Sequence, residues 1–373
     1  MKGEVKKIHL AVTNDLVSDN RVHKIAASLL AMGFEVHLTG RKLRNSPELP
    51  KRFYNIKRMK LLFNKGPLFY AEYNLRLFFR LVFSDYDVMV ANDLDTLGAC
   101  AAVKQFRKIH LVYDSHELFT EVPELINRPK VQRFWSRIER WAMPKVDMAY
   151  TVCQSIAKFY QKKYGIHFRV VRNLPVPHQV AHTPEAFHID NGEKKVILYQ
   201  GALNVGRGLE KAISAMKWID NAKLYIAGAG DIEEELKQLT QEKNLSEKVE
   251  FLRRFPVEEL RYITQQADLG ISLEEDRGLN YRYALPNKIF DYIQSEVPVL
   301  CSDLPEMQQV ITNYKVGGII SHSSTEEELA KAMKEILVNG GHYRPALKQA
   351  AKELTWQNES KELEKIYSLF LLH

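Results

Sequence analysis

The residues best suited to chemistry lie in a glycine-rich stretch in the second half of the chain. An apolar run at residues 196–200 leads into G-A-L-N-V-G-R-G, where Gly201, Gly206 and Gly208 allow close backbone approach and Arg207 lies at the start of an expected helix. Backbone amides at a helix N-terminus, together with a guanidinium, form a site suited to phosphate. A plain turn between strand and helix, with a surface arginine, is the alternative that these residues leave open.

A lysine and an aspartate lie about one helical turn apart in the segment A-L-P-N-K-I-F-D-Y-I. Asn287 is expected to cap this helix, which places Lys288 in the first turn. A cation there opposes the helix dipole unless an anion lies in front of it. With Asp291 on the same helix, the pair suits a phosphate and a sugar hydroxyl group. An ion pair within the helix is the alternative.

Two later strands end in weaker signals. Gly228 and Gly230 form a G-x-G turn, a pattern that is common between a strand and a helix without any ligand. Arg253 and Arg254 stand beside aromatic residues. They either stack on a nucleobase or lie in a solvated loop, and the sequence does not decide between the two.

In the first half of the chain, a histidine follows a strand-like run. His116 is flanked by Asp114 and Glu117 in a polar segment. Histidine is the side chain that changes charge near neutral pH, so it is a candidate for a functional site. A capped turn is the alternative interpretation.

The elements that must position these residues alternate between strand and helix, which predicts an α/β fold of two doubly wound domains. In the first half the expected strands are residues 8–13, 34–38, 87–91, 110–113 and 148–152, and the expected helices are 22–32, 68–83, 96–106, 131–142 and 155–164. In the second half the expected strands are residues 196–199, 224–227, 249–252, 269–273 and 297–301, and the expected helices are 209–218, 232–243, 258–266 and 288–295. A capping box at Thr325 opens a further helix expected to end at Val338.

A polar, proline-rich linker is expected between the two domains, at residues 173–194. Ligands of doubly wound domains bind at the carboxyl ends of the strands. The expected site is therefore a cleft between the two domains.

Composition narrows the class of protein. The chain has 373 residues, of which 45% are hydrophobic and 27% charged, and this excludes collagen-like and disordered classes. No apolar run reaches the roughly 18 residues of a membrane span, and no signal-peptide core follows the start. Cys100, Cys153 and Cys301 are too far apart for a disulfide framework or a zinc site. We therefore expect a protein of the reducing cytoplasm.

Charge is divided unevenly along the chain. Residues 1–180 hold 30 Lys and Arg against 16 Asp and Glu, whereas the remaining residues hold 23 against 30. The excess is densest at residues 41–80, with 11 basic and 2 acidic side chains. This pattern favours an anionic partner such as a membrane surface, a nucleic acid or a phosphorylated acceptor.

Residues 51–83 mix basic and aromatic side chains. A helix there would place Leu75, Phe78, Phe79 and Val82 in one apolar stripe. One interpretation is that the stripe packs on the sheet of the first domain and the charges are solvated. The other is an interfacial surface that holds the protein on an anionic leaflet. Nucleic acid is the disfavoured anion because no nucleic-acid-binding motif is present.

Taken in their order, the segments of this chain resemble the family-four glycosyltransferases (glycosyl transferases group 1), retaining enzymes of the glycosyltransferase B-type (GT-B) fold that use nucleotide-diphosphate sugars without a metal. The matching segments are D-N-R-V-H-K-I-A, A-N-D-L-D-T-L and Y-D-S-H-E-L-F in the first half, and G-A-L-N-V-G-R-G-L, I-A-G-A-G-D, V-E-F-L-R-R-F-P-V-E-E-L, A-D-L-G-I-S-L and P-N-K-I-F-D-Y-I-Q-S-E-V-P-V-L in the second. The resemblance covers nearly the whole chain. It implies two Rossmann-like domains facing across a cleft: an acceptor-side domain at 1–175, to which a C-terminal helix at 356–373 crosses back, and a donor domain at 190–355.

The resemblance also implies roles in donor binding. Gly201 matches the first glycine of the family's phosphate loop, and Arg207 matches the basic residue that binds the donor diphosphate. The loop's other arginine falls on Ala202, and Lys288 is a candidate replacement. Asp291 falls where a family glutamate binds the donor ribose. The expected donor-binding set is completed by Gly228 and Arg253.

Two residues are expected near the donor sugar. His116 matches the family's active-site histidine. The first glutamate of the family's conserved pair falls on Tyr283, which is a departure from the pattern. Glu274, Glu275 or Asp276 could take its role. Glu275 is the residue that we expect to be catalytic, together with His116.

The expected function is transfer of a sugar from a nucleotide-diphosphate sugar to a hydroxyl acceptor, in envelope glycan or lipid-linked saccharide synthesis, at the inner face of a membrane. No cofactor, metal or nucleic acid is expected. The leaving diphosphate, held by Arg207 and Lys288, would help to deprotonate the acceptor, so no protein nucleophile is required. A sugar-nucleotide epimerase of the same architecture and a non-catalytic protein that binds a nucleotide sugar or an anionic surface remain alternatives. A dinucleotide-dependent dehydrogenase is disfavoured, because residues 13–16 lack the G-x-G-x-x-G fingerprint.

Overall fold

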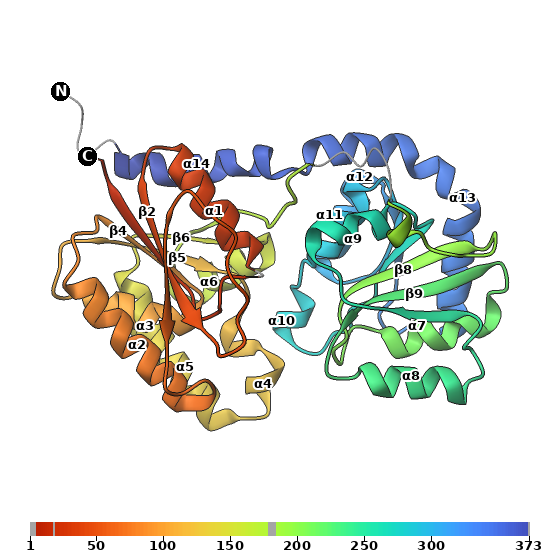
Figure 1. The fold of residues 1–373 in the computed structure, drawn as a ribbon, viewed down its shortest axis with the longest axis horizontal. Helices are drawn as coiled ribbons and strands as arrows, with labels where there is room; N and C mark the ends of the chain where they lie inside the picture. Colours follow the sequence, from red (N-terminus) through yellow and green to blue (C-terminus); the bar gives the residue numbers. More distant parts are fainter. Residues whose placement is uncertain (1–4, 18, 178–183, 372–373) are drawn as a thin grey trace. The chain divides into compact units, whose positions relative to one another are not determined.

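The computed structural model describes residues 5–17, 19–177 and 184–371. The chain divides into two compact units: unit 1 is residues 1–173 with 357–373, and unit 2 is residues 174–356. Each unit contains one parallel sheet with helices around it, which confirms the expected α/β fold of two domains (Figure 1). No helix in the described part of the chain is long and apolar enough to cross a membrane.

Unit 1 is built on a seven-stranded sheet in the order β3-β2-β1-β4-β5-β6-β7, with every pair of neighbours parallel. Its strands are β1 (Lys7–Ala11), β2 (Glu35–Lys42), β3 (Asn55–Lys60), β4 (Val88–Asn92), β5 (His110–Ser115), β6 (Met148–Thr151) and β7 (Phe168–Val170). Its α-helices are α1 (Asn20–Ala31), α2 (Gly66–Val82), α3 (Leu94–Val103), α4 (Pro123–Ile126), α5 (Pro129–Ala142), α6 (Gln154–Tyr164) and α14 (Trp356–Leu371). The strand order reverses between β1 and β4, so the carboxyl ends of these strands form the switch point where such sheets bind ligands.

Small residues let three helices of unit 1 pack side by side. A Cβ added at Gly98, on α3, would lie 3.3 Å from a side-chain carbon of Ile138 on α5. On its other side α3 meets α2, where Asn74 Oδ1 accepts a hydrogen bond from the backbone N–H of Ala99. The three helices α2, α3 and α5 therefore form one layer (Figure 1).

Unit 2 is built on a six-stranded parallel sheet in the order β10-β9-β8-β11-β12-β13. Its strands are β8 (Lys195–Ala202), β9 (Ala222–Ala229), β10 (Val249–Leu252), β11 (Leu269–Ser272), β12 (Val299–Ser302) and β13 (Gly317–Ile320). Its α-helices are α7 (Leu209–Ala215), α8 (Glu233–Glu242), α9 (Val257–Thr264), α10 (Leu279–Arg282), α11 (Asn287–Gln294), α12 (Pro305–Tyr314) and α13 (Glu326–Glu353).

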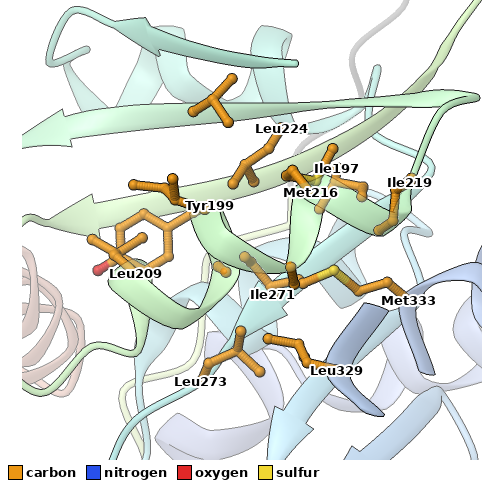
Figure 2. Close-up of a cluster of buried hydrophobic side chains, with 14 of the residues drawn as sticks. Ile197, Tyr199, Leu209, Met216, Ile219, Leu224, Ile271, Leu273, Leu329 and Met333 are labelled. Carbon is orange, nitrogen blue, oxygen red and sulfur yellow. The ribbon is translucent and has the colours of Figure 1, made fainter. Parts of the chain in front are cut away.

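Both faces of the unit 2 sheet are covered, and the alternation along β8 shows it. Ile197 and Tyr199 point to the core that contains α7 and the first half of α13, drawn in Figure 2. Val196 and Leu198 point to the opposite core, which contains α11 and α12. Successive side chains of a strand alternate between faces, so a strand buried on both faces is a continuous apolar run. This is why the sequence predicts the strands of this sheet well.

One helix is much longer than expected. The capping box at Thr325 is confirmed, since its hydroxyl accepts from the Glu328 N–H and the Glu328 carboxylate accepts from the Thr325 N–H. The predicted end at Val338 is wrong, because α13 continues to Glu353 through two glycines and Pro345. Burial of Leu347 and Ala350 against the second core explains how the helix survives these breakers.

A second correction concerns the start of α11. Asn287 does not cap this helix: Pro286 occupies the capping position in an extended conformation, and Asn287 is the first helical residue. Lys288 still lies in the first turn. The sequence also misses the polar edge strand β3, the short strands β7 and β13 and the helices α4, α10 and α12. Of the expected linker at 173–194, residues 178–183 lie outside the described residues, and the rest holds one short 3₁₀ helix, Glu185–Phe187.

Candidate functional site

The glycine-rich loop of unit 2 follows the carboxyl end of β8. Gly206 and Gly208 have φ angles of +85° and +68°, a region that L side chains avoid. A Cβ at Gly208 would lie 2.2 Å from the carbonyl oxygen of Leu273, so this position accepts only glycine. At Gly228 an added Cβ would lie 1.9 Å from the carbonyl oxygen of Gly201, which gives Gly228 a packing role between β8 and β9. The loop is thus held close to the segment that follows β11.

Two cations converge on one buried carboxylate beside this loop. Lys288 Nζ lies 2.9 Å from Glu274 Oε1, and an Arg207 guanidinium nitrogen lies 3.5 Å from the same oxygen. The Ser272 hydroxyl donates to Glu274 Oε2 at 2.7 Å. Glu274 is fully buried. The loop after β8, the end of β11 and the start of α11 therefore meet at one point.

The charge of Glu274 is stabilised despite its burial. Desolvation by burial raises the pKa of this carboxyl, but the charge and hydrogen bond of Lys288 outweigh it, helped by Ser272 and Arg207. The net result is a pKa below the ordinary value. With Glu274 ionised, the group of two cations and one carboxylate carries an excess of one positive charge, which suits an anion.

Both cations also lie over aromatic rings. Lys288 Nζ is 4.1 Å from the centre of the Tyr199 ring, and the Arg207 guanidinium carbon is 5.5 Å from that of Tyr281. Arg207 Nε is buried and has no hydrogen-bond partner among the described residues. A buried donor of this kind is usually satisfied in the functional state, so it is available to an anionic ligand.

Asp291, one turn along α11 from Lys288, belongs to a different network. Its Oδ2 accepts from Gln200 Nε2 at 3.1 Å, and Gln200 Oε1 accepts from the Thr264 hydroxyl at 2.7 Å. Gln200 and Thr264 are buried, whereas Asp291 is partly exposed. The alternative of an ion pair within the helix is not what the structure has, because Lys288 pairs with Glu274.

Two other residues expected in the site, Glu275 and Arg253, form ion pairs with other side chains. The Glu275 carboxylate accepts from Arg277 Nε at 2.5 Å, and its N–H donates to the Gly206 carbonyl. Arg253 is exposed, pairs with Glu259 at 3.1 Å and lies over the Phe255 ring. The structure thus brings Glu274, and not Glu275, to Lys288.

In unit 1, His116 lies just beyond the carboxyl end of β5, between two carboxylates. Its Nδ1 is 3.0 Å from Asp93 Oδ2 and its Nε2 is 3.0 Å from Asp114 Oδ2. Asp114 is fully buried and binds Arg21 through both oxygens, at 3.1 and 2.7 Å. Burial lowers the pKa of His116, but Asp93 and Asp114 outweigh it and raise this pKa well above the usual value.

A further titratable side chain lies on the first turn of α3. Asp95 is buried, and its Oδ2 accepts from the Thr13 hydroxyl at 2.5 Å. Burial, followed by the charge of Asp93, raises the pKa of Asp95 to about 7. Sequence reasoning missed Arg21, Asp93 and Asp95. Asp93 and Asp95 could have been found from their position just after the expected strand at 87–91. Neighbouring parallel strands bring their carboxyl ends together, so side chains there lie near His116.

The described residues contain no group of three or more His, Cys, Asp or Glu side chains placed to hold a metal ion. Cys100, Cys153 and Cys301 are buried and unpaired with one another. Burial raises the pKa of Cys100 to about 12, so this thiol is a packing residue and not a nucleophile.

Both halves of the chain match models of known protein families. The family model described as Glycosyl transferases group 1 matches residues 185–354, and the model described as Glycosyltransferase Family 4 matches residues 19–174. Among curated proteins, an uncharacterised glycosyltransferase of Methanocaldococcus jannaschii is 26% identical over 48% of this chain and 45% of its own length. Chitobiosyldiphosphodolichol beta-mannosyltransferase of Candida albicans is 23% identical over 71% of this chain and 62% of its own. The chain therefore spans less than two thirds of the length of either relative.

Solved structures show the same fold at low identity. Sucrose-phosphate synthase from Thermosynechococcus elongatus superposes with a TM-score of 0.83 and 16% identity over 99% of this chain and 100% of that one. WaaG, a glycosyltransferase involved in lipopolysaccharide biosynthesis, gives 0.74 and 15% over 96% and 99%. Anabaena HepE, solved with UDP and glucose, gives 0.76 and 12% over 98% and 100%. Both halves of this chain match glycosyltransferase family models, and its two domains have the GT-B fold of these solved structures.

Proposed function

We propose that the protein is a retaining glycosyltransferase that moves a sugar from a nucleotide-diphosphate donor to a hydroxyl acceptor without a metal ion. The observation that carries the proposal is the convergence of Arg207 and Lys288 on the buried carboxylate of Glu274. It supplies an excess positive charge and one unsatisfied buried donor beside a glycine-rich loop. A diphosphate is the ligand that matches this chemistry and the activity of the family.

The same cations supply the main catalytic effect in this proposal. As the bond between the anomeric carbon and the phosphate oxygen breaks, its electron pair goes to the diphosphate, and Arg207 and Lys288 stabilise the developing charge. The acceptor oxygen forms the new bond to the anomeric carbon and gives its proton to the leaving phosphate. Attack from the side of the leaving group retains the configuration. Glu275, an acidic residue of the loop after β11, is the unit 2 side chain that we expect at the donor sugar.

The nucleoside end of the donor is assigned to Asp291. The buried Gln200 donates a hydrogen bond to this carboxylate. Asp291 is partly exposed on α11, where it would accept hydrogen bonds from ribose hydroxyl groups. Gly201 and Gly228 shape the loop, and Arg253 extends the donor-binding set. The structures of HepE with UDP and with UDP-glucose support UDP sugars as the first donors to test.

The decisive experiment uses purified protein with EDTA present. UDP, GDP, UDP-glucose and GDP-mannose are titrated by calorimetry, and products of each sugar nucleotide with simple glycoside acceptors are analysed by mass spectrometry and NMR. We expect saturable nucleotide binding and a product heavier than the acceptor by one sugar, with the anomer of the donor. An isomerised sugar nucleotide would instead identify an epimerase, and binding without any turnover a non-catalytic protein. An inverted anomer would overturn the retaining mechanism, and activity lost in EDTA would overturn metal independence.

We further propose that unit 1 binds an anionic membrane surface near a lipid-linked acceptor. Leu75 and Phe79 on α2 are exposed, and the buried side chains of this helix are Phe69, Tyr73, Leu77 and Leu81. The interpretation that the whole stripe is buried is therefore wrong for Leu75 and Phe79. The exposed Phe and Trp side chains of the described residues all lie in unit 1: Phe53, Phe63, Phe79, Phe83, Phe106, Phe134 and Trp141.

Basic side chains accompany these aromatic residues, which is the pattern of interfacial membrane binding. On β3, next to α2 in the chain, Lys57 and Lys60 are exposed. Each basic residue near an anionic surface contributes about 1 kcal/mol. The Candida relative is named for mannosyl transfer to chitobiosyldiphosphodolichol, a lipid-linked diphosphate saccharide, which supports an acceptor of this class.

Cosedimentation with vesicles tests this part of the proposal. The variant Lys57→Ser/Arg58→Ser/Lys60→Ser is compared with a control of equal charge change in unit 2, Lys331→Ser/Lys334→Ser/Lys348→Ser, whose lysines are exposed on α13. Wild type and control should bind vesicles that contain phosphatidylglycerol, release with salt, and ignore phosphatidylcholine alone. Equal loss in both triple variants would mean that net charge alone drives binding, and equal recovery with neutral and anionic vesicles would overturn the proposal.

A further inference from the structure

The ring of His116 has an unusual environment, because an acidic oxygen faces each of its nitrogens. Asp93 lies 3.0 Å from Nδ1 and Asp114 lies 3.0 Å from Nε2. A carboxylate can only accept hydrogen bonds, and a neutral imidazole has one N–H and one lone pair. With a neutral ring, one of the two contacts would set a lone pair against a carboxylate oxygen. With both acidic groups ionised, each ring nitrogen must carry a proton to make both contacts.

The charges around the ring are consistent with an imidazolium. Asp114 is fully buried and neutralised by Arg21, which also donates to the Val171 carbonyl. Asp93 is the counter-ion on the other side. Asp95 and Glu117 act on this cluster from α3 and from the loop after β5. Four tyrosines on β5, β6, α6 and α14 are further titratable groups that interact with its carboxylates or with Arg21: Tyr113, Tyr150, Tyr160 and Tyr367. Two cations thus balance two carboxylates, and a proton lost from His116 would leave the partly exposed charge of Asp93 without its counter-ion.

Asp93 is held in a backbone conformation that only glycine adopts without strain. Its φ is 62° and its ψ is 168°. It also stands at the capping position of α3, where an aspartate normally accepts from the first helical N–H groups. It makes no such bond. Its Oδ1 accepts instead from the backbone N–H of His116 at 2.8 Å, so this side chain is turned away from helix capping and toward the strand end.

Exposure decides which group of the cluster can meet a ligand. The Asp114 side chain is 0% exposed, whereas those of Asp93 and His116 are 22% and 23% exposed. Because both N–H groups of His116 are used by carboxylates, the ring has no polar hydrogen left for a ligand. A carboxylate has about four acceptor positions, and those of Asp93 exceed its two hydrogen bonds to His116.

We propose that Asp93 is the hydroxyl-binding carboxylate of unit 1, and that His116 acts through it as an imidazolium that fixes its position. The assignment rests on the proposed glycosyl transfer for its ligand, a sugar hydroxyl group of either the donor or the acceptor. It replaces the expectation that His116 itself contacts the sugar. The strain at Asp93 is then part of the site, because it turns the carboxylate away from helix capping and toward His116.

The protonation state is tested on the free protein, which separates this test from that of the proposed function. Histidine ring nitrogens are labelled with ¹⁵N, and the His116 signals are assigned with His116→Asn. We expect both nitrogens to remain protonated from pH 6 to pH 8. His322 is an internal reference, because Asp303 binds its backbone N–H and its Nδ1 only, so one ring proton satisfies that contact. A bare ring nitrogen on His116 at pH 7 would overturn the imidazolium.

The role of Asp93 is tested with two variants. Asp93→Asn removes the charge, and Asp93→Gly removes the side chain while relieving the backbone. We expect kcat to fall about 10- to 100-fold in both, because a hydrogen bond to a charged group is lost, while affinity for UDP stays within twofold. The melting temperature of Asp93→Gly should not fall below that of wild type. Unchanged kcat, or a loss that follows reduced stability in both variants, would contradict the proposal.

The source of the hydroxyl group follows from a second assay on the same variants. Hydrolysis of UDP-glucose or GDP-mannose without acceptor is compared with transfer to an acceptor. Loss of transfer with hydrolysis retained would identify an acceptor hydroxyl group, and parallel loss of both would identify a donor sugar hydroxyl group. Retention of both activities would show that Asp93 contacts neither and would overturn the assignment.

Discussion

Lys288 and Glu274 form a buried ion pair, with Nζ 2.9 Å from Oε1, between the first turn of α11 and the residue second after β11. Removing two charges from water is costly, and a buried pair is often no more stable than two apolar residues of similar size. An ion pair kept in this position therefore points to function. It holds the ammonium group of Lys288 beside the glycine-rich loop. In our proposal, a bound diphosphate would replace Glu274 as the partner of this ammonium group.

The first prediction separates stability from function in this pair. Lys288→Met alone leaves Glu274 buried without its main partner, and should lower the free energy of unfolding by about 3 kcal/mol, the low end of the usual range because Arg207 remains nearby. The double variant Lys288→Met/Glu274→Leu should recover most of that loss in urea denaturation. It should still bind UDP more weakly than wild type. Equal stability of single and double variants would contradict the coupling.

Arg207→Ala should weaken donor binding about 10- to 100-fold with little change in stability, because a charge-assisted hydrogen bond contributes roughly 1.5–3 kcal/mol. Ala202 stands where the resemblance implies a second arginine, so this position supplies no guanidinium to the diphosphate. Calorimetry with UDP measures the loss. Arg344→Ala is the matched control, since Arg344 is an exposed arginine on α13 with one long contact to Glu296. If the two variants bound UDP equally, Arg207 would be excluded from the site.

Asp291→Ala and His116→Ala should give opposite kinetic profiles. Loss of Asp291 should weaken the binding of free nucleotide and of nucleotide sugar alike, because ribose is common to both. Loss of His116 should lower kcat while nucleotide affinity survives, since the residue acts at the sugar. Nucleotide titration and steady-state kinetics on both variants measure the difference. The same profile in both would show that the assignment of the ribose and sugar ends is wrong.

Stability should fall at acidic pH because of a histidine far from the proposed chemistry. His9 is fully buried in β1, and desolvation, followed by Arg80 and His37, lowers its pKa to about 3. The unfolded chain binds a proton at this position below about pH 6.5, whereas the folded protein does not. Stability from this site is therefore full above pH 6.5 and is lost as the pH falls, by up to about 1.4 kcal/mol per pH unit.

The slope of unfolding free energy against pH between 6.5 and 4 measures this effect. His9→Gln should flatten the slope, because its amide can keep a hydrogen bond to Thr39 without titrating. His116 contributes in the opposite sense, since its raised pKa gives stability below pH 6.5 that is lost as the pH rises through the folded-state value. The comparison of wild type with His9→Gln isolates the contribution of His9 to the slope. Identical slopes would mean that His9 is protonated in the folded protein.

The sequence predicts the sheets well where the strands are buried on both faces. The predicted strands at 196–199 and 224–227 are uninterrupted apolar runs that lie inside β8 and β9. Residues 249–252, at the edge of the sheet, are predicted with the bounds that β10 has. It misses β3, whose residues are mostly polar, because an exposed edge strand lacks that pattern. It also ends α13 too early, because Gly340 and Gly341 are weak helix formers, and only the core packing of Leu347 and Ala350 beyond them shows that the helix continues.

The candidate site is predicted in part for a related physical reason. Arg207, Lys288 and Asp291 stand in local patterns of a loop or a helix start, so the sequence identifies each of them alone. Their partners do not follow from spacing. Glu274 is 14 residues from Lys288, and Arg21 is 93 residues from Asp114, so only the folded sheet shows which charges meet. This is why the sequence favours Glu275, while the structure places Glu274 between the cations.

The last prediction compares two glycine-to-alanine changes in unit 2 that should have opposite signs. At Gly208 the backbone has φ +68°, and a Cβ would lie 2.2 Å from the Leu273 carbonyl oxygen, a backbone atom directly after β11. Gly208→Ala should therefore displace the loop, lower the free energy of unfolding by more than about 1 kcal/mol and abolish UDP binding. At Gly341, inside α13, a Cβ meets nothing within 4 Å. Gly341→Ala should stabilise the protein by about 0.5–1 kcal/mol, because alanine loses less backbone entropy in a helix, and should leave UDP affinity unchanged. Thermal unfolding and calorimetry on both variants test the pair, and a stable Gly208→Ala that still binds UDP would show that the loop does not need its left-handed turn to hold a diphosphate.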